Sequence, residues 1–590
     1  ATDANFQSIE GIIAHEYFHN WTGNRITCRD WFQLTLKEGL TVFRDQEFSS
    51  DMTSRPVKRI EEVNYLRNAQ FTEDSGPTAH PIKPAAYIEI NNFYTPTVYR
   101  KGAEVIRMIH TLIGKDNFRS GMDKYFELYD GQAVTTEDFV NAMEIASGRD
   151  LTHFKNWYSQ AGTPRLDVSS SYDVKAQKFT LNVKQWCPAT DECQHKKPFH
   201  LPMSVGLLNA AGNDIELSIN GEALGTNAVL EITEAEHTFV FENVSEKPVP
   251  SLLRNFSAPV ILNYDYENVE LAFLLANDSD DFNRYDAGQR LATAELETII
   301  AAYQAGEDMC VGDEVLSAFG ALIGDAEIDD AFKAEALALP SVTTLIERMD
   351  ECDYEAAHES RDFLRLAIAA AHQAAFQAIY EKTNIDCEYS VDPKEVGRRS
   401  LKNTVLSYLC ALETDAAIAL AAQQFETASN MTDEVSALSI LAQIEADAAA
   451  KANQAFYDKW KEDVLVMNKW FSVQSGSKRP GVLERIKALE DDKAYDRENP
   501  NKIRSLIGPY LGGRHFHAIN GEGYAFLADK IIEIDSFNPS MASGLSKGFR
   551  KYAKMDSERQ ALMKFAMERI LGKDNISKDV YEIISKTINI

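Results

Sequence analysis

The sequence predicts a multidomain, predominantly α-helical protein in which a small β-sandwich separates two helical regions. At 590 residues the chain is too long for a single hydrophobic core. Apolar residues recur at helical spacing before Pro164 and again after Glu267, whereas between these points they alternate with a period of two. These changes of period place three domains at residues 1–162, 163–266 and 267–590.

The first domain is expected to begin with two amphipathic helices. From Asn5 to Thr22, apolar residues recur every three or four positions, and a glycine follows. A second helical pattern runs from Trp31 to Phe48, and Tyr99 stands at the start of a later one. The turn at residues 161–164 closes this helical region.

The middle domain shows the alternation of half-buried strands. Residues 179–183 alternate between apolar and polar side chains, and residues 201–207 alternate in the same way. The turn at 211–214 leads into a third such run, and two shorter runs follow at 238–242 and 260–262. Several short strands over roughly a hundred residues favour a small β-sandwich.

Residues 267–590 predict a large helical domain. This region is rich in Ala, Leu and acidic residues, and short polar or proline-containing turns interrupt it at 339–341, 430–433 and 498–501. The pattern predicts an array of paired helices, a helical-repeat or solenoid-like domain, although no strict repeat is visible in the sequence.

Composition excludes several classes of partner. The chain has 60 Lys and Arg against 90 Asp and Glu, a net charge of −30, which argues against nucleic acid or an anionic membrane surface. No apolar run is long enough to span a bilayer. Seven scattered cysteines, an odd number, do not form a disulfide framework, so a cytoplasmic location is expected.

The strongest chemical signal is the stretch from His15 to His19, with Glu16 directly after the first histidine. Residues four apart on a helix lie one above the other, so both imidazoles can reach one metal ion while Glu16 projects beside them. Glu38 follows on the second predicted helix, after eighteen intervening residues. Two histidines and a carboxylate in this order are typical of a mononuclear zinc peptidase, whereas two satisfied helix histidines would be the ordinary alternative.

Asp45 lies seven residues after Glu38 and therefore shares its helix face. A buried pair of carboxylates is costly without a cation or hydrogen bonds. A zinc ion would compensate Glu38, and Asp45 would suit a place behind the metal, accepting a hydrogen bond from a ligand imidazole or an arginine. A plain surface or salt-bridged aspartate is the alternative.

Three stretches resemble the gluzincin zinc aminopeptidases, in particular their bacterial aminopeptidase N branch. They are residues 15–25, 36–48 and 91–110, and the similarity extends to the C-terminus through residues 501–508. The resemblance implies a thermolysin-like catalytic region, followed by a β-sandwich and a large helical domain. This order agrees with the domains that periodicity predicts.

The resemblance also implies the roles of individual residues. It makes His15, His19 and Glu38 the ligands of one Zn²⁺ and Glu16 the general base. It makes Tyr99 the donor of a hydrogen bond to the oxyanion, although a tyrosine at a helix start more often serves packing. It further suggests that Arg504 lines the substrate channel, where a surface or salt-bridged arginine is the more common reading.

One departure from the family concerns the substrate amine. In the family a Gly-x-Met-Glu-Asn element upstream of the zinc motif binds the free α-amino group, and nothing like it occurs in this sequence. The chain also starts without a methionine or a secretion signal. We therefore expect a fragment or processed product whose functional form includes an associated upstream N-terminal segment, and whose surface without that segment bears an apolar patch.

The expected function is removal of N-terminal amino acids from peptides that have a free N-terminus, with some preference for basic or small residues, as in the family. Two alternatives remain open. A thermolysin-like endopeptidase would share the zinc ligands and the base. A helical-repeat scaffold would bind partners and carry a vestigial or structural zinc site.

Overall fold

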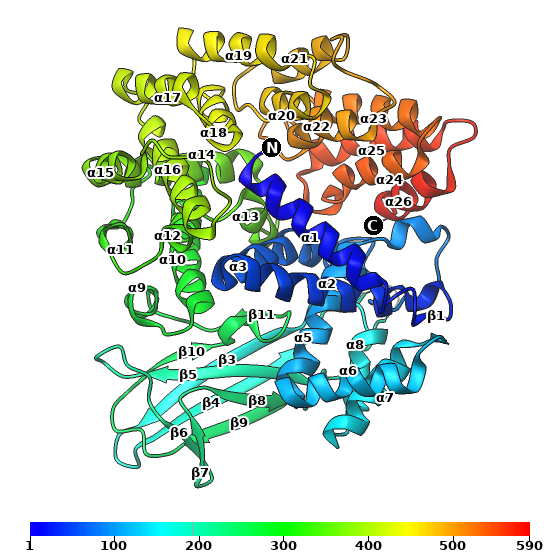
Figure 1. Ribbon diagram of the computed structural model, residues 1–590, viewed down its shortest axis with the longest axis vertical. Coiled ribbons are helices and arrows are strands. Elements are labelled where there is room, and N and C mark those ends of the chain that lie inside the picture. The colour runs from blue at the N-terminus through cyan, green and yellow to red at the C-terminus, as the bar shows by residue number, and fades with distance from the viewer. Residues whose placement is uncertain (191–192, 590) are drawn as a thin grey trace. The chain divides into compact units, whose positions relative to one another are not determined.

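The computed structural model describes residues 1–190 and 193–589 and contains two compact units (Figure 1). The first unit is Gln7–Leu291; the second, here called the helical unit, is Ala1–Phe6 together with Ala292–Ile590. Among the described residues, every strand lies in the first unit. The predicted fold class, a predominantly helical protein with a small β-sandwich, is confirmed.

The helices of the first unit pack against one another. In this unit α2 packs against α5, and α6 lies beside α7 (Figure 1). Thr135 begins α7 with a capping box, and Gly148 ends it in the left-handed conformation. The helices are α1 (Asp3–His19), whose first residues group with the helical unit, α2 (Leu34–Met52), α3 (Arg55–Tyr65), α4 (Phe71–Asp74), α5 (Gly102–Ile113), α6 (Lys115–Tyr129), α7 (Thr136–Ser147) and α8 (Asn156–Ser159).

Two helices differ from their expected bounds. The helix expected over Asn5–Thr22 ends earlier, at His19, because the chain folds back there and the Asn24 N–H reaches the His19 carbonyl at 2.8 Å. The helix expected over Trp31–Phe48 opens as the 3₁₀ turn η1 (Trp31–Gln33), and the rest forms α2. Asp30 caps this turn by accepting a hydrogen bond from the Phe32 N–H.

Two sheets form the predicted β-sandwich. The larger sheet has the order β11-β3-β4-β9-β6-β7 and the smaller has the order β10-β5-β8. The strands of these two sheets are β3 (Arg165–Asp173), β4 (Lys178–Trp186), β5 (Leu201–Leu208), β6 (Leu217–Ile219), β7 (Glu222–Gly225), β8 (Ala228–Ile232), β9 (Glu236–Phe241), β10 (Val249–Leu252) and β11 (Ile261–Asn263). The short strands β1 (Thr27–Cys28) and β2 (Ala133–Val134) pair separately, in parallel.

The alternation expected for residues 201–207 is wrong as a pattern of burial. β4 does alternate, with Phe179, Leu181 and Val183 buried, but every residue of β5 is buried, Ser204 among them. β5 is the middle strand between β10 and β8, and α5 packs against it. A central strand with both faces covered tolerates only small or apolar side chains.

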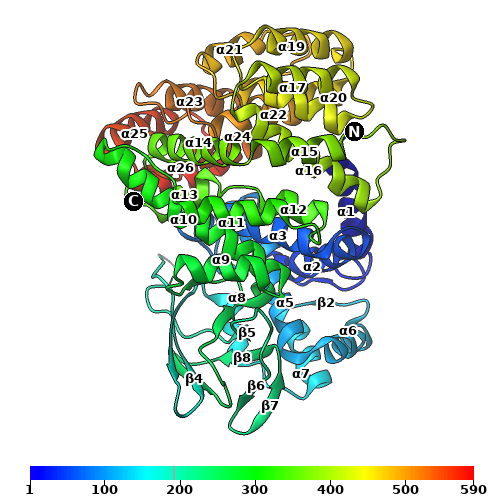
Figure 2. The same cartoon turned by 90° about the vertical axis from the view of Figure 1, so that its left-hand side faces the viewer.

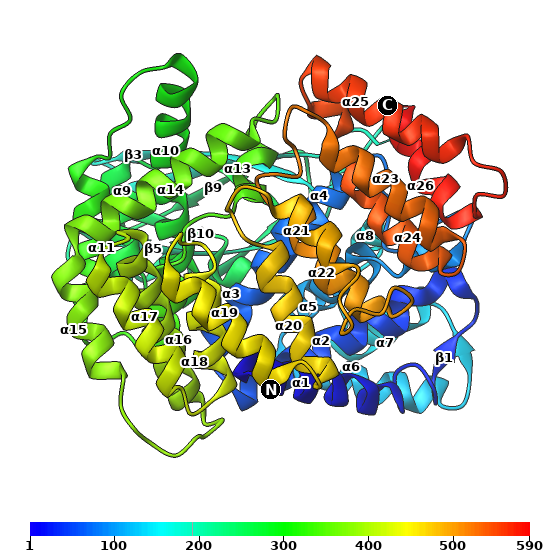
Figure 3. The same ribbon diagram turned by 90° about the horizontal axis from the view of Figure 1, so that it is seen from above.

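The helical unit is a succession of paired helices. α15 packs on α16 (Figure 2), and α23 packs on α24 (Figure 3). The breaks predicted near Ser341, Asn430 and Asn499 are confirmed, because each of these side chains caps the N-terminus of the next helix. α9 (Asn268–Asn277) and the first residues of α10 (Asp281–Ala305) still belong to the first unit. The helices that follow are α11 (Asp313–Gly324), α12 (Asp330–Ala336), α13 (Val342–Arg348), α14 (Tyr354–Ala371), α15 (Gln373–Thr383), α16 (Pro393–Ala411), α17 (Asp415–Thr427), α18 (Met431–Leu441), α19 (Asp447–Trp460), α20 (Val464–Ser475), α21 (Val482–Leu489), α22 (Pro500–Leu511), α23 (Glu522–Asp535), α24 (Pro539–Ser546), α25 (Ser557–Leu571) and α26 (Lys578–Ile588). In the part of the chain that the structure describes, no helix combines the length and apolar character needed to cross a membrane.

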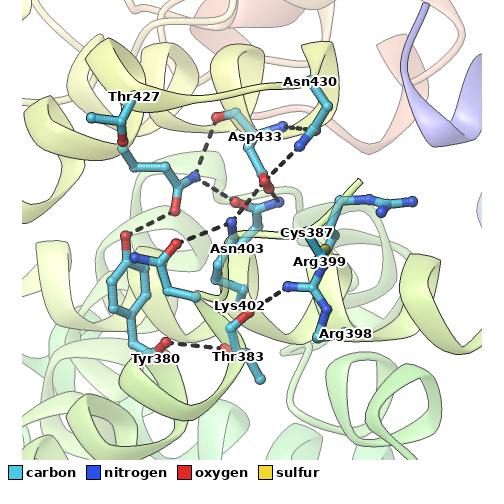
Figure 4. A network of polar contacts seen from close by, with 12 residues as sticks. Tyr380, Thr383, Cys387, Arg398, Arg399, Lys402, Asn403, Thr427, Asn430 and Asp433 are labelled. Carbon is cyan, nitrogen blue, oxygen red and sulfur yellow. Dashed lines mark hydrogen bonds and ion pairs between the residues drawn. The ribbon is translucent and has the colours of Figure 1, made fainter. Parts of the chain in front are cut away.

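A buried polar network ties α16, α17 and α18 together (Figure 4). Asp433 Oδ2 accepts hydrogen bonds from Lys402 Nζ at 2.7 Å and from Asn430 Nδ2 at 2.9 Å, and Oδ1 accepts one from Asn403 Nδ2 at 3.0 Å. Gln424 on α17 donates to Asn403 Oδ1 at 2.8 Å. Because Asp433 and Lys402 are both buried, each charged group needs the other to offset the cost of its burial.

Removing the Asp433 carboxylate should destabilise this part of the helical unit. In Asp433→Ala the Lys402 ammonium stays buried without its charge partner, which should lower the free energy of unfolding by about 3–5 kcal/mol. Hydrogen exchange of the α16 and α18 amides measures this destabilisation in the region where it occurs. As control, the double variant Lys402→Met/Asp433→Leu leaves no unpaired charge and should recover most of the protection. Unchanged exchange in Asp433→Ala would contradict the dependence of the two charges on each other.

Candidate metal centre

His15, His19 and Glu38 converge in the first unit. α1 presents the two histidines one turn apart, and α2 brings Glu38 against both of them. Glu38 Oε2 lies 3.3 Å from His15 Nε2 and 3.2 Å from His19 Nε2. Among residues 1–190 and 193–589 this is the only group of at least three His, Cys, Asp or Glu side chains placed to hold a metal ion, with its ligand atoms within 4.8 Å of one another.

Each imidazole is oriented through its other ring nitrogen. His15 Nδ1 lies 2.7 Å from Asp45 Oδ2, and His19 Nδ1 lies 3.0 Å from the carbonyl oxygen of Thr22. An ionised carboxylate and a carbonyl only accept hydrogen bonds, so each Nδ1–H donates. A neutral imidazole in this tautomer turns the lone pair of Nε2 toward the other two side chains of the group.

Thr22 is a contact that the sequence does not indicate. Its carbonyl reaches His19 because the chain reverses at Gly23, whose φ of +146° lies where residues with a side chain are strained. A Cβ on Gly23 would also lie 2.7 Å from His19 Nδ1. The glycine after the helix is the only trace in the sequence of this arrangement, and it reads there as a plain helix stop.

The three donors fit a zinc ion by type, number and spacing. In a tetrahedral site with metal–ligand bonds of about 2.0–2.1 Å, neighbouring ligand atoms lie about 3.3 Å apart. The two Nε2–Oε2 separations, 3.3 and 3.2 Å, match this value. Two imidazoles and one carboxylate also leave a fourth position for water or substrate, which is the composition of catalytic sites.

The surroundings of His15 favour its protonated form. Burial lowers the pKa of His15, but the hydrogen bonds and charges of Asp45 and Glu38 outweigh it and raise the pKa to about 9. Burial raises the pKa of Glu38, but its bonds to His15, His19 and Lys37 hold it far below its usual range. At neutral pH His15 is therefore a cation paired with Glu38, and a metal must displace its proton.

Tyr99 approaches the same group from a third element. It lies in the π-helical turn η4 (Thr97–Lys101), which leads into α5 and packs against α2, the helix that carries Glu38. Burial and the charge of Glu38 hold the pKa of Tyr99 well above its usual value, so the phenol stays protonated and remains a donor. Glu16, next to His15 on α1, is exposed, so its carboxylate is open to solvent.

Two glycines let α2 and α5 approach closely beside these residues. Gly39 follows Glu38, and Gly102 follows the turn that carries Tyr99. A Cβ on Gly39 would lie 2.9 Å from the carbonyl carbon of Gly102, and one on Gly102 would lie 2.3 Å from Thr35 Oγ1. A side chain at either position would push Glu38 and Tyr99 apart.

Arg504 belongs to the helical unit. It lies on α22, is exposed, and donates to Asn501 Oδ1 at 3.3 Å. Arg504 is therefore not one of the residues that form the metal-binding group.

Three protein-family models match consecutive parts of the chain. The peptidase family M1 domain matches residues 1–158. A domain of unknown function with an Ig-like fold matches residues 162–265, and a domain of unknown function with ARM repeats matches residues 268–589.

The chain is also similar to characterised proteins over its whole length. It is 45% identical to "Aminopeptidase N" of Escherichia coli (strain K12) and 42% identical to "Aminopeptidase N" of Haemophilus influenzae, covering 68% and 67% of these relatives. Among solved structures, Legionella pneumophila aminopeptidase A in complex with aspartic acid matches all of this chain at 31% identity with a TM-score of 0.89. The chain covers 66% of that protein.

Zinc affinity should rise with pH because binding displaces the His15 proton. Between pH 6.5 and 9, the ordinary and the raised pKa of His15, the apparent association constant is expected to rise about tenfold per pH unit and then to level off. Competition with a chelator of known pH dependence measures this slope.

The matched control for this measurement is Asp45→Asn. It removes a charge that raises the His15 pKa, so the rise should level off at a lower pH. It also weakens the orientation of His15, which should reduce the limiting affinity about 10–100-fold. A zinc affinity that is constant from pH 6.5 to 9 would contradict the paired proton.

Proposed function

Because the chain belongs to the aminopeptidase N family of M1 peptidases, we propose that it is a zinc aminopeptidase that removes N-terminal amino acids from peptides with a free N-terminus. One Zn²⁺ would be held by His15, His19 and Glu38. The observation that carries this proposal is the convergence of three donor atoms, in which the Glu38 oxygen lies at the spacing of a tetrahedral zinc site from both imidazole nitrogens.

The side chains around the metal position would carry out the proton transfers. When bound, Zn²⁺ supplies a Lewis acid that polarises the scissile carbonyl and acidifies the attacking water. Glu16 would accept the proton of that water and pass it to the leaving amine. Tyr99 would donate its phenolic hydrogen to the carbonyl oxygen as negative charge develops there. The raised pKa of Tyr99 supports this role, because the donor keeps its proton.

Two contacts would hold the ligands in place. Asp45 fixes the ring of His15 through Nδ1, and the Thr22 carbonyl fixes the ring of His19. Hydrogen bonds of this kind raise the basicity of a ligand imidazole and fix its tautomer. We therefore give Asp45 a supporting role behind the metal rather than a place among its ligands.

We also propose that an upstream N-terminal segment completes the binding site for the substrate amine. The sequence has no Gly-x-Met-Glu-Asn element, and the relatives extend well beyond the matched region. α1 supports the proposal independently, because Ile9, Ile13 and Tyr17 form an apolar row along it that is 52%, 63% and 58% exposed. Such a row is typical of a surface that another segment covers.

Three further assignments belong to the same proposal. The domains would be 1–162, 163–266 and 267–590, and the ranges of the three matching family models support these limits. Arg504 would contribute to the path of the peptide through the helical domain. A reducing, cytoplasmic location is supported by the cysteines, all of which are free among the described residues.

Glu16→Gln tests the proposed catalysis. Because the amide cannot accept a proton, kcat/KM for a free-amine peptide should fall about 10²–10⁴-fold while the zinc content stays the same. Glu10→Gln, the same change elsewhere on α1, is the control and should keep its activity. If function in cells is unchanged in Glu16→Gln, the enzymatic proposal fails and the alternative of a helical-repeat scaffold that binds partners is favoured.

A pair of peptides tests the exopeptidase part of the proposal. A substrate with a free N-terminus should be cleaved and its N-acetylated form should not, because the upstream site recognises the ammonium group. The assay uses the natural full-length protein and the 590-residue chain in parallel. Cleavage of only the acetylated peptide would favour a thermolysin-like endopeptidase instead.

A further inference from the structure

Tyr99 lies in an unusual stretch of backbone. In the turn η4 the Gly102 N–H reaches back five residues to the Thr97 carbonyl, which is the hydrogen-bond pattern of a π-helix. A second π-helical turn, η2 (Leu66–Gln70), lies against it, and Gln70 Nε2 donates to Thr97 Oγ1 at 3.2 Å. Such turns are rare because they are less favourable than an α-helix, and they persist only where surrounding contacts hold them.

The start of the turn is held by one buried carboxylate. Glu73 Oε2 accepts hydrogen bonds from the main-chain N–H of Thr97 at 3.1 Å and from its hydroxyl at 2.7 Å. Glu73 is 6% exposed and Thr97 is fully buried. A carboxylate that accepts two such bonds fixes both the backbone and the side chain of the residue where the π-turn begins.

The end of the turn is held by a second buried carboxylate. Lys101 Nζ lies 2.8 Å from Asp74 Oδ2 and donates to the Gly162 carbonyl, also at 2.8 Å. Thr163 Oγ1 donates to the same oxygen of Asp74 at 2.9 Å. Lys101 and Asp74 are both buried, so removing either side chain would leave the other charge buried without a partner.

Two further contacts hold the middle of the turn. Thr35 on α2 donates to the Val98 carbonyl at 2.7 Å, and Arg100 pairs with the buried carboxylate of Glu62 on α3. Together with the contacts at both ends, these fix the four residues that flank Tyr99. The turn packs against α2, the helix that carries Glu38, so these contacts also fix where Tyr99 stands relative to Glu38.

We infer that Glu73 is a positioning residue for the reaction: through Thr97 it fixes the π-turn that directs the Tyr99 phenol at the metal site. This inference rests on the proposed function, because it assumes that Tyr99 acts on the substrate. An ordinary α-helical start would satisfy the backbone equally well, but it has one residue fewer in the turn and would rotate Tyr99 away from Glu38. Glu73 therefore acts on the geometry of another side chain and does not touch the substrate.

The test is a double-mutant cycle between Glu73 and Tyr99 in the zinc-loaded, full-length natural protein. Glu73→Ala should lower kcat for a free-amine peptide about 10–100-fold, with KM and zinc content unchanged, because a displacement of about 1 Å at the donor has an effect of this size. In the Tyr99→Phe background, Glu73→Ala should cause no further loss. Losses that multiply would show that Glu73 acts independently of Tyr99 and would overturn the inference.

Two more variants keep the test decisive. Glu73→Gln retains an oxygen of the same reach and should keep most of kcat, as a positioning role requires. If Glu73→Ala does not fold, Thr97→Val replaces it: this variant removes the hydroxyl while keeping the backbone N–H, and it should show a smaller loss with the same dependence on Tyr99. Full activity in a folded Thr97→Val protein, with multiplicative behaviour in the double variant, would also overturn the inference.

The controls separate this inference from the proposed function. Asp278→Ala removes another buried carboxylate of the first unit, one that pairs with Arg254 and does not contact the π-turn, so it should lower stability and leave kcat unchanged. If Tyr99→Phe alone has full activity, the proposed role of Tyr99 fails. If Tyr99→Phe is impaired and folded Glu73→Ala is not, only the positioning role of Glu73 fails.

Discussion

The contact of the Glu38 carboxylate with two imidazoles is the interaction on which the site depends. One oxygen of Glu38 lies within 3.3 Å of both Nε2 atoms, and this fixes where α1 must lie against α2. The turn after His19 and the glycine contact between α2 and α5 follow from that requirement, because each brings a further group to the same place. A buried carboxylate is costly without compensation: Lys37 pairs with one oxygen of Glu38, and a proton or a metal cation would compensate the oxygen that faces the two imidazoles.

The first unit repeats this solution around the metal position. Several buried carboxylates there have their own cations: Asp74 contacts Lys101, Glu62 contacts Lys58 and Arg100, and Glu104 forms two hydrogen bonds with Arg59. The half-buried Asp45 contacts His15 in the same way. Such pairs contribute little net stability compared with apolar packing, but breaking one of them is costly. They therefore favour one arrangement of the chain over others. A catalytic site needs this, because it must hold its atoms to within about 0.5 Å.

The sequence was informative wherever local spacing decides the outcome. The interval between His15 and His19 and the shared helix face of Glu38 and Asp45 follow from the helical period, so the grouping of these residues could be predicted. The breaks between helices could be predicted because capping residues act locally. The burial of both faces of β5 could not, since it depends on which strands and helices cover it. The Thr22 contact, the π-turn and the role inferred for Glu73 also depend on residues that meet only in the folded chain.

The proposed function depends on the metal centre, and zinc K-edge X-ray absorption of the zinc-loaded protein tests that centre most directly. One equivalent of zinc should bind, with imidazole nitrogen and carboxylate oxygen neighbours at about 2.0–2.1 Å and no sulfur neighbour. Glu38→Gln should change this first shell or weaken binding, whereas a change remote from the site should not. A sulfur shell at about 2.3 Å, which would place zinc on cysteines, or the failure to bind one equivalent, would contradict the account.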